Sequence, residues 1–327
     1  MKSIIKNLLK IFQLPIDLFF LIIIFPSAYI LLFYRKLGSN RLPKTTLLLK
    51  AIGVFPILNH YYEPLFKDNL ISYPLDKDRY LPGIDLNKES QINLLSNLNF
   101  SSELVSLNLN KKKNKSEFFD IYNGLFESGD AEFLYQFIRH IKPNKIIEVG
   151  SGNSTKMARL AINKNKDDKK DNCEHICIEP YEQPWLEKLE GIKVIRKRIE
   201  DCKFDWVNEL NADDLLFIDS SHMIRPQGDV LKIYLEIIPQ LKAGVYIHVH
   251  DIFTPKDYLK TWIVDDVRFW NEQYLLEALL SNTDRYEVVA GLNFLKNNYF
   301  DKFSKVCPYV TKEREPGSFY FKVKSVN

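Results

Sequence analysis

The segment from Lys145 to Ile162, KIIEVGSGNSTKMARLAI, carries the residues best suited to bind a cofactor. An apolar run ends in an acid, a loop with two glycines follows, and a helical pattern begins directly after it. Glycines let the backbone approach a ligand closely, and the first N–H groups of the following helix have no partner within the helix. A second apolar run, HICIEPY, ends in another acid about thirty residues later, the length expected of a βαβ unit. These features predict a nucleoside-containing cofactor at Gly150, Ser151, Gly152, Asn153 and Ser154.

The order of residues narrows the choice of cofactor. A dinucleotide fingerprint needs a third glycine at the helix, and a phosphate-binding loop needs Gly-Lys before Ser or Thr; the segment has neither. Glu148 lies two residues before the first glycine, where it would repel an anionic pyrophosphate and tolerate a cationic sulfonium. Glu179 closes the second run, at the position where an acid commonly binds ribose hydroxyls. S-adenosylmethionine (SAM), which has both a sulfonium and a ribose, fits these two acids.

Two further strand ends hold groups that could act as bases or ligands. The run LLFIDSSH supplies Asp219, Ser220 and His222, and the run YIHVHD supplies His250 and Asp251. Ligands of open α/β sheets bind at the carboxyl ends of the strands. We therefore expect these side chains to face the cofactor loop, with Asp219 and Ser220 also contacting the cofactor.

Methyl transfer from a sulfonium is an in-line displacement, so the protein mainly positions the acceptor and removes its proton. A hydroxyl has a high pKa, and a general base or a divalent metal ion lowers the resulting barrier. We predict His222, Asp251 and His250 as catalytic residues. Asp219, His222, His250 and Asp251 could also hold Mg²⁺ or Mn²⁺ through carboxylate and imidazole ligands. A metal-free route with His222 as the base stays open, as does a purely cofactor-binding role for Asp219.

The loop E-V-G-S-G-N-S resembles motif I of class I SAM-dependent methyltransferases, and C-I-E-P-Y resembles their acidic second motif. The segments I-D-S-S-H and H-V-H-D are similar to pairs found in a bacterial branch of that family, which includes metal-assisted O-methyltransferases acting on sugars. The resemblance covers residues 126–327. It implies that Gly150 and Gly152 line the methionine portion of SAM and that Glu179 holds the ribose. We also predict Glu148 as a residue that contacts the cofactor.

The elements that would position these groups alternate between apolar runs and helical patterns through the second half of the chain. Such alternation predicts an α/β fold, with a doubly wound, mostly parallel seven-stranded sheet and helices on both faces. The resemblance implies an antiparallel last strand. We predict three regions: a basic lead and hydrophobic membrane segment (1–35), an irregular Pro- and Tyr-rich region (36–117), and the methyltransferase domain (118–327).

Residues 18–34 form an uncharged apolar run, LFFLIIIFPSAYILLFY, barely long enough to span a bilayer. Basic residues flank it on both sides, so charge does not fix its orientation. Pro26 favours a kink, which leaves a single span and a re-entrant dip with both ends cytoplasmic as two open arrangements. A cleaved signal peptide and a buried core helix are the other interpretations. We expect membrane attachment, with the catalytic domain in the cytoplasm, where SAM is made.

The function most consistent with these features is a SAM-dependent methyltransferase at the cytoplasmic membrane face. Its acceptor would be an oxygen of a sugar, a lipid-linked glycan or another small molecule. A non-catalytic SAM-binding or scaffold protein of a membrane-bound assembly is the alternative. The net charge of +3, from 45 Lys and Arg against 42 Asp and Glu, argues against a nucleic-acid partner. The sequence does not determine the oligomeric state.

Overall fold

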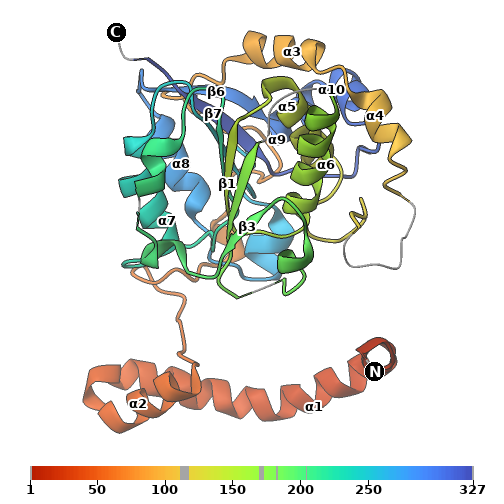
Figure 1. Ribbon diagram of the computed structural model, residues 1–327. Helices are drawn as coiled ribbons and strands as arrows, with labels where there is room; N and C mark the ends of the chain where they lie inside the picture. The colour runs from red at the N-terminus through yellow and green to blue at the C-terminus, as the bar shows by residue number, and fades with distance from the viewer. Residues whose placement is uncertain (1, 111–117, 169–172, 182, 204, 326–327) are drawn as a thin grey trace. The chain divides into compact units, whose positions relative to one another are not determined.

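The computed structural model describes residues 2–110, 118–168, 173–181, 183–203 and 205–325. The chain divides into two compact units, residues 1–72 and 73–327. Figure 1 labels the main helices and strands of both units in chain order.

The first unit is built on one long helix, α1 (Lys2–Leu37). Within it, Phe12–Leu37 is long and apolar enough to cross a membrane. The sequence left a kinked or re-entrant segment open at Pro26, but the helix is continuous through this residue. The hydroxyl of Ser27 donates to the carbonyl of Ile23 at 2.9 Å, one turn earlier. Length and composition are the only evidence for a membrane span.

Short elements follow α1 in the same unit. A 3₁₀ turn, η1 (Ser39–Arg41), leads into α2 (Pro43–Ile52), and a second turn, η2 (Asp68–Leu70), lies near the end of the unit. Proline at the first position of α2 suits a helix start, because its missing N–H would have no partner there. Gly53, with φ of +84°, ends the helix in the left-handed conformation that glycine adopts easily.

The second unit contains one seven-stranded sheet with the order β3-β2-β1-β4-β5-β7-β6. β1 pairs in parallel with β2 and β4, and β4 pairs in parallel with β5. β7 runs antiparallel to both β5 and β6. The structure therefore confirms the predicted α/β fold, the mostly parallel sheet and the antiparallel last strand. The strands are β1 (Lys145–Val149), β2 (Glu174–Ile178), β3 (Lys193–Ile195), β4 (Leu215–Ile218), β5 (Tyr246–Val249), β6 (Tyr286–Gly291) and β7 (Phe319–Val323).

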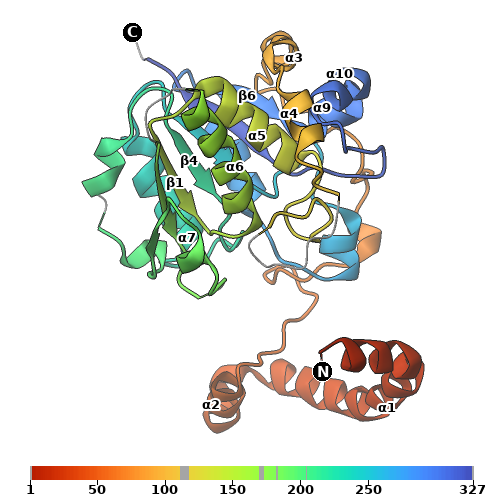
Figure 2. The ribbon, with the colours of Figure 1, turned by 45° about the vertical axis from the view of Figure 1, so that its right-hand side comes forward.

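Helices cover both faces of this sheet (Figures 1 and 2). Successive strand residues point to opposite faces, so each strand feeds two separate cores. In β4, Phe217 is buried in the core shared with α5 and α6, whereas Ile218 is buried in the core shared with α7 and α8. The helices are α5 (Asp130–Ile141), α6 (Asn153–Asp167), α7 (Asp229–Lys232) and α8 (Glu272–Leu280).

The second unit begins at Tyr73, well before the predicted domain start at residue 118. Leu95 and Leu104 lie in the region predicted to be irregular, yet both are buried in the same core as α5 and α6. Residues 111–117 lie outside the described residues. The second unit also contains four shorter helices: α3 (Lys88–Asn97), α4 (Ser101–Ser106), α9 (Leu292–Asn298) and α10 (Phe300–Val306).

A buried arginine connects α4 to two helices that cover the sheet, α5 and α6. Arg139 of α5 is only 3% exposed and donates to both carboxylate oxygens of Glu103 in α4, at 2.9 and 2.8 Å. The same guanidinium donates to Asp168, just past the end of α6, at 2.6 Å. Three helices thus share one cation, so the segment before residue 118 is an integral part of the domain.

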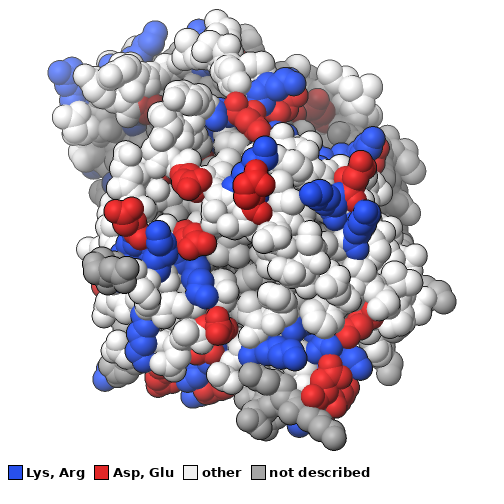
Figure 3. Space-filling view, turned by 90° about the horizontal axis from the view of Figure 1, so that it is seen from above, with Lys and Arg blue, Asp and Glu red and all other residues white. Residues whose placement is uncertain are grey.

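The face in Figure 3 carries acidic and basic side chains in alternation. Neither sign gathers there into a broad continuous patch. This face therefore presents no single-sign field of the kind that binds a polyanion.

Candidate active site

A cleft of about 760 Å³ opens at the carboxyl ends of β1, β2, β4 and β5. Ligands of open α/β sheets bind at this edge. Every predicted site residue except Glu148 lines the cleft, so the structure brings together groups that are up to a hundred residues apart in the chain. These residues are Gly150, Ser151, Gly152, Asn153, Ser154, Glu179, Asp219, Ser220, His222, His250 and Asp251.

The cofactor loop, residues 150–154, begins directly over the end of β4. Gly150 has φ of +79°, and a Cβ atom at this position would overlap the backbone carbonyl of Asp219. The Gly150 N–H donates to the Ile178 carbonyl at 3.0 Å, and the Asp219 N–H donates to the Val149 carbonyl at 2.8 Å. The fold itself therefore requires glycine at position 150.

Gly152 differs from Gly150 because, among the described residues other than its two chain neighbours, no atom lies within 4 Å of the place a Cβ would occupy. Its N–H donates to Thr155 Oγ1 at 3.0 Å, which fixes the first turn of α6. The packing leaves room for a side chain here, so the fold does not require this glycine. Close approach of a ligand to the backbone would explain why glycine occupies position 152.

Glu148 lies behind the loop and is 1% exposed. One carboxylate oxygen accepts a hydrogen bond from Ser154 Oγ at 2.6 Å, and the other lies 3.0 Å from His175 Nε2 and 3.6 Å from Cys177 Sγ. The predicted direct contact with the cofactor gains no support from this position. Instead, Glu148 ties the start of α6 to β1 and β2.

Glu179 lies at the end of β2 and lines the cleft. Its two carboxylate oxygens accept the N–H groups of Ser151, at 3.3 Å, and Tyr181, at 2.9 Å. These bonds join the cofactor loop to the second acid motif and fix the orientation of the carboxylate.

His222 lies among three carboxylates beyond the ends of β4 and β5. Its Nδ1 is 2.8 Å from Glu272 Oε2, and its Nε2 is 3.3 Å from Asp219 Oδ1 and 3.4 Å from Asp251 Oδ2. His222 and Asp251 have φ of +58° and +59°, a conformation uncommon outside glycine. Such backbone outliers concentrate at functional sites, where the surrounding structure holds them in place.

These contacts set the charges of the cluster. Burial alone would lower the pKa of His222, but its hydrogen bonds with Asp219 and Glu272 outweigh burial and raise that pKa well above 6.5. Burial would likewise raise the pKa of Asp219, but the hydrogen bond with His222 lowers it below its ordinary value. These contacts favour the protonated form of His222, in which the imidazole is not a free base.

The two histidines of β5 and its end have different surroundings. His250 Nε2 is 3.4 Å from Asp251 Oδ1, and its ring packs on Phe126 with the ring centroids 5.0 Å apart. His248 is fully buried and stacks on Tyr320 at 4.5 Å, and neither ring nitrogen has a hydrogen-bond partner among the described residues. His250 therefore belongs to the cleft and His248 to the core.

The geometry of three side chains suits a divalent cation. One ligand atom each from Asp219, His222 and Asp251 lie within 4.8 Å of one another. Neighbouring ligands of an octahedral ion with bonds of about 2.1 Å are about 3 Å apart, close to the separations seen around His222 Nε2. His250, the fourth predicted ligand, falls outside this group and contacts the other oxygen of Asp251.

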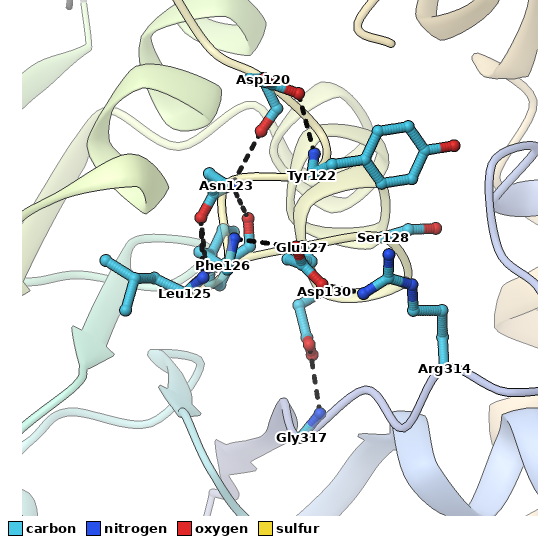
Figure 4. A network of polar contacts seen from close by, with 12 residues as sticks. Asp120, Tyr122, Asn123, Leu125, Phe126, Glu127, Ser128, Asp130, Arg314 and Gly317 are labelled. Carbon is cyan, nitrogen blue, oxygen red and sulfur yellow. Dashed lines mark hydrogen bonds and ion pairs between the residues drawn. The ribbon is translucent and has the colours of Figure 1, made fainter. Parts of the chain in front are cut away.

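A loop of residues 120–128, which the sequence did not single out, supplies another wall of the cleft (Figure 4). Asn123 organises it: its Oδ1 accepts the N–H groups of Leu125 and Phe126 at 3.0 and 2.9 Å. The same oxygen accepts a hydrogen bond from the Asn153 side chain of the cofactor loop at 2.9 Å. Leu125 and Phe126 both line the cleft, so this loop is fixed directly to the cofactor loop.

Three other residues near the cluster were not predicted as site residues. Glu272 is fully buried and bonds to His222, and the Trp270 ring centroid is 4.4 Å from that of His222. Asp229, the first residue of α7, accepts both the N–H and the hydroxyl of Ser221 at 2.7 Å. Glu272 follows His222 by 50 residues, so no local spacing links the two.

Residues 147–252 match the protein family described as a methyltransferase domain. The matched range contains the cofactor loop, the acids Glu148 and Glu179, and the strand ends at Asp219 and Asp251. The chain belongs to the class I SAM-dependent methyltransferase family. This methyltransferase is 32% identical over 170 residues to an uncharacterized protein of Archaeoglobus fulgidus, covering 49% of this chain and 75% of that protein.

Solved structures similar to this methyltransferase include two O-methyltransferases, both at low sequence identity. The O-methyltransferase TomG from Streptomyces achromogenes, in complex with SAM, is 12% identical, with 69% of this chain and 96% of that chain covered and a TM-score of 0.38. An O-methyltransferase from Bacillus cereus, in complex with SAH, is 12% identical, with 72% and 91% covered and a TM-score of 0.36.

Proposed function

We propose that this methyltransferase transfers the methyl group of SAM to an oxygen of a sugar, a lipid-linked glycan or another small molecule. The cluster of Asp219, His222 and Asp251, in the same cleft as the cofactor loop, carries the proposal. An oxygen nucleophile must lose its proton as the bond to the methyl carbon forms. A carboxylate within reach of the acceptor can take that proton. A protein that only binds SAM would not need such a carboxylate.

SAM would lie with its ribose at Glu179 and its methionine portion along residues 150–154. The backbone N–H groups of Ser151 and Tyr181 hold the Glu179 carboxylate in one orientation, which suits paired ribose hydroxyls. The open space beside Gly152 would admit the cofactor against the backbone. Glu148 would support this loop through Ser154 rather than touch the cofactor.

The acceptor hydroxyl would lie between the methyl group and the carboxylate of Asp251. As its oxygen attacks the methyl carbon, the C–S bond breaks and its electron pair stays on sulfur, giving S-adenosylhomocysteine. The proton of the hydroxyl passes to Asp251, which is 18% exposed and therefore reachable from the cleft. Protonated His222 would orient the carboxylates and balance their charge.

A divalent cation held by Asp219, His222 and Asp251 is a second version of the same proposal. When bound, Mg²⁺ or Mn²⁺ would lower the pKa of a hydroxyl that it contacts. His222 Nε2 must give up its proton to act as a ligand, so proton and metal compete for this atom. Rates measured with added Mg²⁺ and with a chelator separate the two versions.

Attachment at the cytoplasmic membrane face is part of the proposal. The apolar stretch Phe12–Leu37 supports it by length and composition. An enzyme anchored in this way would lie close to a lipid-linked acceptor in the same membrane.

The test uses the full chain in detergent with SAM labelled in its methyl group, offered to sugars and to lipid-linked glycans. We expect label on an oxygen of one acceptor class and formation of S-adenosylhomocysteine. Asp251→Asn should lower kcat by about 10²-fold or more without changing SAM affinity, because only proton removal is lost. Asp301→Asn, an exposed carboxylate of α10 outside the cleft, is the matched control. Label on nitrogen or carbon, or full activity in Asp251→Asn, would overturn the proposal.

A further inference from the structure

The helix α2 exposes an apolar face. None of its residues is buried, and Leu47, Leu48 and Ile52 are 67%, 59% and 65% exposed. Leu48 and Ile52 are four residues apart and lie on the same side of the helix, and Leu47, about 100° around the helix from Leu48, borders that side. Val54, 53% exposed, extends this side past the end of the helix. Apolar side chains gathered on one side of a helix indicate contact with another apolar phase.

The opposite side of α2 is fastened to the end of α1. The Tyr34 hydroxyl lies 2.6 Å from Thr46 Oγ1, and the Thr46 hydroxyl also lies within hydrogen-bond distance, 2.7 Å, of the Ser39 carbonyl. Tyr34 is 4% exposed and packs edge-on against Phe55 with the ring centroids 6.4 Å apart. Leu48 is about 200° around the helix from Thr46, so the apolar side turns away from this contact.

The segment of residues 18–62, which contains α2, carries basic but no acidic side chains. No acidic residue occurs between Asp17 and Glu63, whereas five basic residues occur there: Arg35, Lys36, Arg41, Lys44 and Lys50. Glu63, the first acid, is paired with Arg35. Such basic segments next to a membrane helix are attracted to anionic headgroups.

Two exposed tyrosines add to this pattern. Tyr61 and Tyr62 are 91% and 84% exposed, and their ring centroids are 5.1 Å apart. Tyrosine, with an apolar ring and a polar hydroxyl, concentrates at the boundary between lipid and water.

We infer that α2 lies in the surface of an anionic membrane, with Leu47, Leu48 and Ile52 among the acyl chains and the basic side chains at the headgroups. The inference rests on the proposed attachment through α1 and adds a second lipid contact beside the helix exit. A partner protein is disfavoured because it would have to match both an apolar face and an acid-free basic segment.

The test places a tryptophan on each side of α2. The full chain carrying Leu48→Trp or Lys50→Trp is reconstituted in phosphatidylcholine vesicles with and without phosphatidylglycerol, using lipids brominated near the headgroup end of the acyl chains. The four native tryptophans all lie in the second unit, so the unsubstituted chain gives their contribution. Residues 48 and 50 are about 200° apart on the helix, which makes Lys50→Trp the matched control.

We expect the tryptophan added at position 48 to be quenched at least about twofold more than the one at position 50, and more strongly with phosphatidylglycerol than without. Equal quenching at the two positions, or no dependence on the anionic lipid, overturns the inference. Extraction of the same vesicles with alkaline carbonate tests α1 separately. A chain that stays in the vesicles but shows no difference between positions refutes the α2 contact alone, whereas a chain that is extracted refutes the proposed attachment.

Discussion

The two glycines of the cofactor loop give opposite predictions, although they are only two residues apart. A side chain at position 150 meets the carbonyl of Asp219 and must adopt φ of +79°. A side chain at position 152 meets no atom of the described residues within 4 Å apart from its chain neighbours, and φ there is −169°, outside the left-handed region. Gly150→Ala should therefore damage the fold, and Gly152→Ala should damage the binding of SAM.

The expected magnitudes follow from these surroundings. The left-handed conformation costs a residue with a Cβ about 1–2 kcal/mol, and relieving an overlap in a packed region costs about 1–3 kcal/mol more. We expect Gly150→Ala to lower the free energy of unfolding by about 2–5 kcal/mol. Gly152→Ala should change it by less than about 0.5 kcal/mol. It should weaken SAM binding about tenfold or more, or about 1.4 kcal/mol, because the added methyl group occupies the space proposed for the ligand.

Urea unfolding followed by tryptophan fluorescence measures the first quantity, since all four tryptophans report on the second unit. Calorimetric titration of the detergent-solubilised chain with SAM measures the second. Wild-type stability in Gly150→Ala would show that the loop does not pass over β4 as described. Wild-type affinity in a folded Gly152→Ala variant would show that this loop does not contact the cofactor.

Two further predictions concern an acid of the cleft and a buried cation. Glu179→Ala should weaken SAM binding about tenfold to a hundredfold in calorimetry through loss of the ribose contact. Glu190→Ala, an exposed acid outside the cleft, should not, and equal effects of the two would refute the ribose role. Burial alone would raise the pKa of Glu103, but hydrogen bonds from Arg139 and Tyr135 outweigh it and hold that pKa below 4.5. This stabilisation is complete above pH 4.5 and is lost as the pH falls through the lowered pKa. Arg139→Met should cost about 3 kcal/mol of unfolding free energy in urea titrations at pH 7, and clearly less at about pH 3. A cost independent of pH would mean that packing, not the ion pair, holds α4 in place.

The features that could be located from the sequence are local ones. The loop of residues 150–154, the acid at Glu179 and the strand ends at Asp219 and Asp251 each lie next to an apolar run that is recognisable by itself. Parallel strands bring their carboxyl ends to one edge, so these segments had to meet there once the sheet was predicted.

The features that the sequence did not reveal depend on contacts between distant segments. Glu272 reaches His222 only because α8 packs beside the end of β4, and nothing near Glu272 in the chain indicates that role. Asn123 likewise gains its importance from the bond to Asn153. The helices α3 and α4, which precede residue 118, are short and weakly patterned in the sequence; α3 depends on packing against β6 and α10, and α4 on its contacts with α5, rather than on their own propensity.

We expect SAM to bind in the cleft at the carboxyl ends of β1, β2, β4 and β5. Amide hydrogen exchange of the full chain with and without SAM tests it most directly, because this measurement reports both binding and its location. We predict slower exchange over residues 150–156 and 179–181, and no change around another cavity of the domain, which Ser101 and Lys305 line. SAM binding that leaves residues 150–156 unprotected, or that protects the cavity at Ser101 and Lys305 instead, would contradict this prediction.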